Sequence, residues 1–179
     1  MVARNGITFV PNLPTEEVFT LPHRARVEGE VAAAKPLIYN GSSIDGMHLT
    51  FAEGRVVRFS ARKGESSLDQ LLRTDEGSSR LGEVALVADS SPISRSGITF
   101  HNTLFDENAS SHLALGQAYK FTLSGAENLS DEDFAQGGGN TSKVHSDFMI
   151  GSGRMDIDGL HQDGASEPIM RSGEWAFEV

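Results

Sequence analysis

The chain has 179 residues, no cysteine and a formal net charge of −10, and these features exclude several classes of protein. Without cysteine there is no disulfide scaffold, no cysteine-ligated zinc and no thiol nucleophile. No apolar run approaches the roughly 18 residues of a membrane helix, so we expect no membrane partner. No secretory signal follows the first residues, and we therefore expect a cytoplasmic protein.

The charge is unevenly distributed along the chain. Residues 1–100 hold 11 basic and 12 acidic residues, whereas residues 101–179 hold 4 and 13. Such an acidic chain repels the phosphates of nucleic acids, so we expect no nucleic-acid partner. The carboxylates either form a solvated surface or face inward onto cations, and composition alone leaves both readings open.

Strand patterns dominate the first half of the sequence. Residues 48–60 are typical of a hairpin that turns at Glu53-Gly54. Three leucines spaced i, i+3 and i+4 predict a helix over about 66–74. An apolar run then predicts a buried strand over 84–88. Further short strands are expected at 7–10, 18–20, 26–31 and 97–100.

The second half is expected to hold a second helix over 109–119, a strand over 144–150 and a hairpin around Asp158-Gly159. Together the segments predict an α+β fold, in which a strand-rich, mixed or antiparallel twisted sheet is accompanied by a few helices. The length is that of one domain, which we place over residues 1–179.

His145-Ser146-Asp147 is the most informative local pattern. Alternate residues of a strand share one face, so the imidazole and the carboxylate point the same way. Their backbone separation of about 7 Å lets both side chains reach one metal ion. The pattern is short, and taken alone it is more often a solvated surface pair.

His112 and Tyr119 form a second pair, seven residues apart in the expected helix and therefore on one stripe of it. A tyrosine beside a ligand histidine can donate its hydroxyl hydrogen to an oxyanion. Taken alone, the pair is more often one that bridges core and surface.

Three acidic positions are also notable. Glu83 begins the buried run, where a carboxylate needs a cation, a metal ion or a proton. Glu107 precedes the expected helix and could be only a helix-start acid. Of Glu16 and Glu17, only one can face inward from an extended segment.

Signatures of other hydrolases are missing from the sequence. There is no HExxH motif of a single-zinc protease. Gly151-Ser152-Gly153 lacks the flanking residues of a nucleophile elbow. The glycine-rich run at 136–140 lacks the GK[ST] ending of a phosphate-binding loop.

Four segments resemble, in order and spacing, the thermophilic-type metalloaminopeptidases of family M29. They are NLPTEEVFT (12–20), GEVALV (82–87), TLFDENASSHLALG (103–116) and HSDFMIG (145–151). The resemblance extends over essentially the whole chain. Members of the family are roughly twice as long, so the resemblance implies the carboxy-terminal catalytic domain without the amino-terminal half. It also implies a homodimer.

The resemblance implies a site for two divalent metal ions. It assigns the ligands to Glu17, Glu83, Glu107, His112, His145 and Asp147, and it makes Tyr119 the catalytic tyrosine. Four carboxylates would offset the charge of two dications. Oxygen and imidazole ligands favour zinc, cobalt or manganese, and magnesium is also possible. We expect Asp147 to bridge the ions, because it shares a strand face with His145.

The implied function is an aminopeptidase that releases the first residue of peptides with a free amino terminus. A hydroxide between the ions would attack the first peptide carbonyl, and Tyr119 would donate to the oxyanion. One of the three glutamates would take the proton, and the sequence does not say which. Two alternatives remain: a metal-binding or dimerisation domain with little activity because the amino-terminal half is missing, and a dinuclear hydrolase for other amides or esters.

Overall fold

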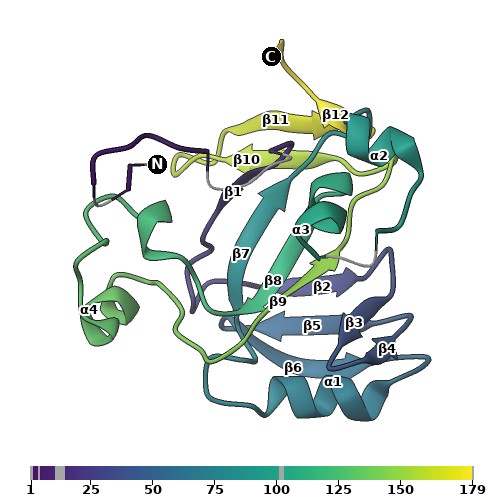
Figure 1. Cartoon of the computed structure of the whole chain (residues 1–179), viewed down its shortest axis with the longest axis horizontal. Coiled ribbons are helices and arrows are strands. Elements are labelled where there is room, and N and C mark those ends of the chain that lie inside the picture. The colour runs from purple at the N-terminus through teal and green to yellow at the C-terminus, as the bar shows by residue number, and fades with distance from the viewer. Residues whose placement is uncertain (1, 4, 11–14, 101–102, 179) are drawn as a thin grey trace.

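The centre of the fold is a four-stranded antiparallel sheet in the order β1-β7-β8-β9 (Figure 1). The computed structural model describes residues 2–3, 5–10, 15–100 and 103–178. The four strands are β1 (Val18–Thr20), β7 (Leu81–Leu86), β8 (His112–Gly116) and β9 (His145–Met149). Segments from both halves of the chain therefore meet in one sheet.

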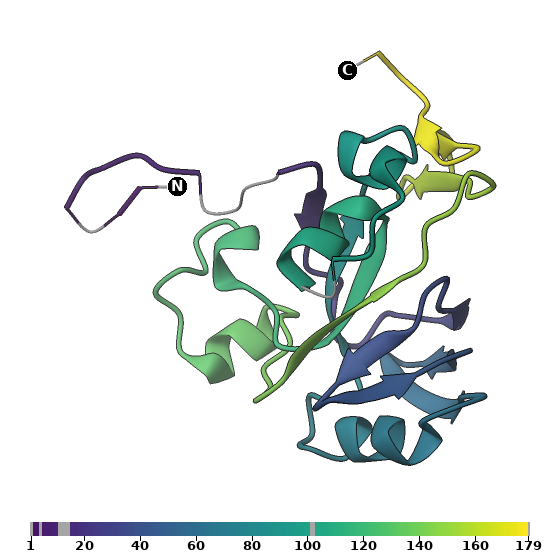
Figure 2. The ribbon, with the colours of Figure 1, turned by 45° about the vertical axis from the view of Figure 1, so that its right-hand side comes forward.

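Smaller sheets lie on opposite sides of the central one, as the views of Figures 1 and 2 agree. On one side lie α1 (Glu65–Leu72) and two sheets made of β2 (Gly29–Ala32), β5 (His48–Ala52) and β6 (Arg55–Ser60), and of β3 (Leu37–Tyr39) and β4 (Ser42–Ile44). On the other lies the sheet of β10 (Ile157–Leu160), β11 (Ser166–Arg171) and β12 (Glu174–Trp175). The remaining α-helices are α2 (Pro92–Ser96), α3 (Thr103–Asp106) and α4 (Asp131–Gln136).

The main hydrophobic core joins the central sheet to α1 and β5. It contains Leu68 and Leu71 of α1, Phe51 of β5, and Leu115 and Phe148 of the central sheet. Leu115 and Phe148 point away from the face that carries His112, because successive strand residues face opposite ways. One face of the central sheet thus packs on the main core, and the other carries His112.

Several expectations are confirmed. The fold is α+β and its strand pairs are antiparallel. The hairpin of β5 and β6 turns at Glu53-Gly54, where both residues have positive φ angles of 49° and 76°. The first helix and the buried strand occur as α1 and β7.

Apart from these expectations, no helix in the part of the chain that the structure describes is long and apolar enough to cross a membrane.

The helix expected over 109–119 is wrong. A 3₁₀ turn at Glu107–Ala109 ends there, and β8 follows it between β7 and β9. Both faces of this central strand are largely covered, so its apolar run shows no period of two. Gly116 closes the strand with φ at 104°, a conformation that no α-helix contains, and a Cβ there would lie 2.1 Å from the carbonyl oxygen of Val144.

Three strand expectations also need correction. Residues 97–100 form no strand, and residues 7–10 contribute only an isolated bridge between Thr8 and Val2. Asp158-Gly159 lies within β10 rather than at a turn. The hairpin turns at residues 161–165 instead, where Gly164 has a φ of 87°.

Candidate metal centre

One face of the central sheet brings the acidic and imidazole side chains together. The register pairs Ala114 of β8 with Glu83 of β7 on one side and with Asp147 of β9 on the other. Directly paired residues share a face, so two carboxylates flank a small side chain in one row. His112 and His145 lie two residues along β8 and β9 and therefore face the same way.

The first group of ligand-type side chains consists of Glu17, Glu83 and His112. Nε2 of His112 lies 3.2 Å from Oε2 of Glu17 and 3.4 Å from Oε1 of Glu83. Nδ1 of the same ring is 2.9 Å from the carbonyl oxygen of Ser110, which can only accept, so Nδ1 carries the hydrogen. A backbone carbonyl that fixes one ring nitrogen while the other faces carboxylates is the arrangement of a metal-binding histidine.

The second group consists of Glu83, His145 and Asp147. Nε2 of His145 lies 3.2 Å from Oδ1 of Asp147 and 3.9 Å from Oε2 of Glu83. Its Nδ1 donates to the carbonyl oxygen of Gln117 over 2.7 Å. Glu83 thus offers one oxygen to each group. The geometry favours Glu83 as the shared carboxylate, where the sequence had led us to expect Asp147.

Four of the five side chains in the two groups are almost fully buried, and that of His145 is 21% exposed. His112 is fully buried, and Glu83 and Asp147 are 5% and 8% exposed. Among the described residues, no lysine or arginine pairs with Glu83 or Asp147. Nε2 of His112 and Oδ1 of Asp147 make no hydrogen bond within that part of the chain. Because buried, unneutralised carboxylates are costly, this donor set fits divalent cations.

Without a metal ion, protons on the imidazoles supply the positive charge. Burial lowers the pKa of His112, but the negative carboxylates of Glu17 and Glu83 beside its Nε2 outweigh this and raise the pKa to about 10. Burial likewise lowers the pKa of His145, but the neighbouring carboxylate of Asp147 outweighs this and raises the pKa to about 9. In the absence of metal, the carboxylates therefore stabilise protonated imidazoles.

Tyr119 and Glu107 lie at the edge of these groups. The ring of Tyr119 is 4.9 Å from that of His145, centroid to centroid, and it follows β8 instead of sharing a helix with His112. Burial and the negative charge of Asp147 raise the pKa of Tyr119. Glu107 belongs to neither group, although its charge contributes to the pKa rise of Tyr119 and so reaches the site.

Supporting residues were not anticipated from the sequence. The buried side chain of Asn108 accepts a hydrogen bond of 2.7 Å from the backbone of Glu16, which fixes the segment that carries Glu17. Ser111 Oγ accepts from the amide of Val87 and donates to its carbonyl oxygen, which ties the start of β8 to the end of β7. In the sequence, only the positions of Asn108 next to Glu107 and of Ser111 next to His112 could have indicated such a supporting role.

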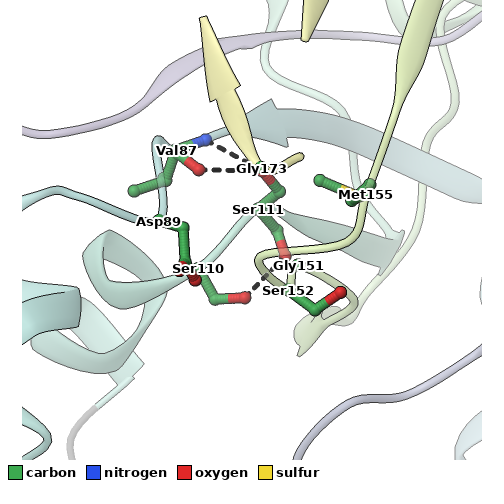
Figure 3. A pocket seen from close by; sticks show the side chains of 8 residues that line it. All are labelled: Val87, Asp89, Ser110, Ser111, Gly151, Ser152, Met155 and Gly173. Carbon is green, nitrogen blue, oxygen red and sulfur yellow. Dashed lines mark hydrogen bonds between the residues drawn. The ribbon is translucent and has the colours of Figure 1, made fainter. Parts of the chain in front are cut away.

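A small cavity lies beside the hydrogen bonds between Ser111 and Val87 (Figure 3). It is lined in part by Ser110, Ser111, Gly151 and Gly173. The drawn contacts include the two hydrogen bonds between Ser111 and Val87. None of the six ligand residues assigned from the sequence lines the cavity. The cavity therefore lies beside the contact between Ser111 and Val87 and is not part of the two ligand groups.

Ala114 places only a methyl group between Glu83 and Asp147. It is fully buried, and its strand neighbours are Glu83 and Asp147. We expect Ala114→Leu to lower zinc affinity by at least about tenfold, because the added carbons fill the space that the ions need. Isothermal titration calorimetry of the metal-free protein measures this, and Ala114→Gly, which keeps the space, is the control. Unchanged affinity in Ala114→Leu would place the ions elsewhere.

Comparisons with known proteins find one protein family and several relatives. The sequence profile described as Thermophilic metalloprotease (M29) matches residues 1–175. Aminopeptidase 2 of Geobacillus stearothermophilus is 55% identical over 177 residues, which are 99% of this chain and 43% of that protein. Aminopeptidase T of Thermus thermophilus is 55% identical over 165 residues, 92% of this chain and 40% of that protein.

A solved structure is also similar. Wild-type AmpT from Thermus thermophilus matches with a TM-score of 0.91 and 51% sequence identity, over 99% of this chain and 43% of that one. The chain therefore spans less than half the length of the relatives that it matches.

Proposed function

Because the chain belongs to the M29 family of thermophilic metalloproteases, we propose that it is the metal-binding catalytic part of an aminopeptidase. The relatives that it matches are named aminopeptidases. The observation that carries the proposal is the pair of overlapping acidic and imidazole groups on one sheet face, which share Glu83. The substrates would be peptides with a free amino terminus. From the resemblance we also propose a cytoplasmic homodimer.

The two groups would hold two divalent ions of zinc, cobalt or manganese, with magnesium also possible. Glu17, Glu83 and His112 would hold one ion, and Glu83, His145 and Asp147 the other. Glu107 would complete the site from its edge. When bound, such ions supply Lewis-acid chemistry, which polarises a carbonyl and lowers the pKa of water.

The remaining steps belong to the side chains. Tyr119 would donate its hydroxyl hydrogen to the oxygen of the attacked carbonyl. A phenol carries its proton at neutral pH, and the raised pKa of Tyr119 is consistent with that protonated state. A carboxylate would accept the proton of the attacking water and return it to the leaving amine. Glu17, Glu83 and Glu107 all remain candidates for this base.

The principal alternative is a metal-binding module with little activity of its own, since the chain spans only 43% of a relative such as Aminopeptidase 2. The test is to load the chain with zinc or cobalt, count the ions and assay leucine p-nitroanilide beside full-length Aminopeptidase T. An aminopeptidase cleaves this substrate and not its N-acetyl form. Two bound ions without turnover would support the module, and cleavage of the N-acetyl form would support a different hydrolase.

Metal binding is expected to release about two protons per chain near pH 7.5. His112 and His145, with pKa values of about 10 and 9, are then protonated, and each must be neutral to bind a metal ion. Apparent affinity should therefore rise with pH until about pH 10. Because both pKa values lie above the ordinary 6.5, the metal-free fold should lose stability progressively as the pH rises from 6.5 to about 10.

Calorimetry in buffers of different ionisation enthalpy measures the released protons, and thermal unfolding of the metal-free protein against pH measures the stability. A heat of binding that is independent of the buffer would contradict the expectation, since it would mean that both imidazoles are neutral before the metal arrives.

A further inference from the structure

Asn140 lies at the end of the glycine-rich run 136–140, fully buried beside the segment that leads to Tyr119. Its side-chain nitrogen Nδ2 is 2.6 Å from the carbonyl oxygen of Gly116 and 2.8 Å from that of Gly77. Carbonyl oxygens can only accept, so the amide donates a hydrogen to each of them and its orientation is fixed. One buried side chain therefore joins three segments that are distant in the sequence.

The glycines before Asn140 allow the chain to pass close to two rings. A Cβ at Gly138, where φ is 98°, would lie 2.5 Å from the ring of His23. A Cβ at Gly139 would lie 2.3 Å from the ring of Phe134, which is fully buried. Such distances are too short for a side chain, so both positions require glycine. The run lacks the ending of a phosphate-binding loop, and in the fold it brings Asn140 into the interior.

Asn140 fastens the turn after β8 from two sides. Its side chain binds the carbonyl of Gly116, and its own carbonyl oxygen accepts a hydrogen bond of 2.9 Å from the amide of Ala118. Gln117 lies between these two contacts, and its amide donates to the carbonyl oxygen of Val144 over 2.7 Å. All three residues of the turn are therefore hydrogen-bonded to the segment that begins at Asn140.

Two functional groups depend on where this turn lies. The carbonyl oxygen of Gln117 accepts the hydrogen bond from Nδ1 of His145, and Tyr119 is the second residue after Gln117. Tyr119 is 40% exposed, so little packing surrounds its side chain, and its ring touches that of His145. The backbone that Asn140 fastens therefore determines where this ring begins.

We propose that Asn140 is a positioning residue for Tyr119: it fixes the turn after β8 and thereby the place from which the hydroxyl of Tyr119 acts. The inference rests on the proposed function, in which that hydroxyl donates to the oxygen of the attacked carbonyl. A donor contributes to catalysis only where it is aligned with the charge that develops. Without the amide of Asn140, the buried carbonyls of Gly77 and Gly116 lose a donor, and the turn shifts to recover hydrogen bonds with water.

The test uses the fact that the chain contains only two tyrosines, Tyr39 and Tyr119. Labelling with ring-fluorinated tyrosine gives one fluorine NMR signal for each, and Tyr39→Phe and Tyr119→Phe assign them. The spectra of the unmodified protein and of Asn140→Ala are compared, and amide hydrogen exchange of the turn is measured in both. These readouts require neither metal nor turnover.

Ser78→Ala is the matched control. Ser78 is also fully buried, and its hydroxyl lies 2.9 Å and 2.8 Å from the carbonyl oxygens of Leu72 and Asp75. Its side-chain hydrogen bonds stay within residues 72–78, so its loss weakens the fold without touching the turn after β8.

In Asn140→Ala the signal of Tyr119 should shift and broaden, whereas that of Tyr39 should stay in place. Ser78→Ala should leave both signals unchanged. The amide of Ala118 should exchange at least about tenfold faster in Asn140→Ala, because the loss of a buried hydrogen bond loosens the turn locally. If Asn140→Ala fails to fold, Asn140→Ser should give the same selective change, because its hydroxyl is too short to reach both carbonyls.

Kinetics of the zinc-loaded protein add a second readout. Asn140→Ala should lower kcat for leucine p-nitroanilide at least about tenfold and keep two zinc ions per chain. In the Tyr119→Phe background the same replacement should change kcat by less than about threefold, because the group that it positions is already gone. A merely structural side chain would lower kcat equally in both backgrounds.

Several results would overturn the inference. An unchanged Tyr119 signal in Asn140→Ala would reject it and leave the proposed function intact. A change in both tyrosine signals, or the same change in Ser78→Ala, would make Asn140 a general support of the fold. Loss of zinc from Asn140→Ala would assign its effect to His145 instead. If the unmodified zinc-loaded chain cleaves no substrate, the proposed function fails, while the NMR spectra still decide whether Asn140 positions Tyr119.

Discussion

Replacing Glu83 with glutamine is expected to remove both metal ions, whereas Asp147→Asn is expected to remove one. Glu83 contributes an oxygen to each of the two groups, and Asp147 belongs to one of them. An amide has no charge to offset a dication, so both ions lose a ligand at once in Glu83→Gln. Elemental mass spectrometry of the zinc-loaded proteins gives the number of ions per chain.

Peptidase activity in Glu83→Gln should fall by at least about a thousandfold, because the several kcal/mol that metal ions contribute to the transition state are lost. Glu167→Gln on the exposed strand β11 removes the same charge at the surface and should keep both ions. Melting of the metal-free variants shows whether the fold survives. The opposite ranking, with one ion in Glu83→Gln and none in Asp147→Asn, would make Asp147 the bridging ligand.

Part of the candidate centre follows from strand geometry alone. His145 and Asp147 were expected to share a face because they alternate in one strand, and their side chains do lie 3.2 Å apart. The same reasoning succeeds for the β5–β6 hairpin, where a turn sequence and alternation act over a few residues. Such features depend on neighbours in the chain, and a sequence displays those directly.

The features that the sequence hides depend on pairing between distant segments. His112 was expected on a helix with Tyr119, but hydrogen bonding to β7 and β9 makes the segment a strand. The sharing of Glu83 likewise arises from the register that places Ala114 opposite both Glu83 and Asp147. The resemblance to the family identified the candidate ligands, while their division into two groups that share Glu83 depends on the register.

Tyr119→Phe is expected to lower kcat by about 100- to 1,000-fold while the metal content stays at two ions per chain. The phenol keeps its proton, because burial and the neighbouring carboxylates raise its pKa, and removal of one oxyanion donor has an effect of this size. The phenylalanine ring preserves the contacts with His145 and Phe121. Steady-state kinetics with leucine p-nitroanilide and metal analysis measure the two quantities.

Tyr39→Phe removes the hydroxyl of the chain's other tyrosine, on β3, and should leave kcat unchanged. Loss of metal in Tyr119→Phe would assign Tyr119 a structural role, and a higher KM at normal kcat would make it a binding group. Tyr119→Phe should slow substrates with large and small first residues equally, because the variant removes a hydrogen bond to the transition state that does not depend on the substrate side chain.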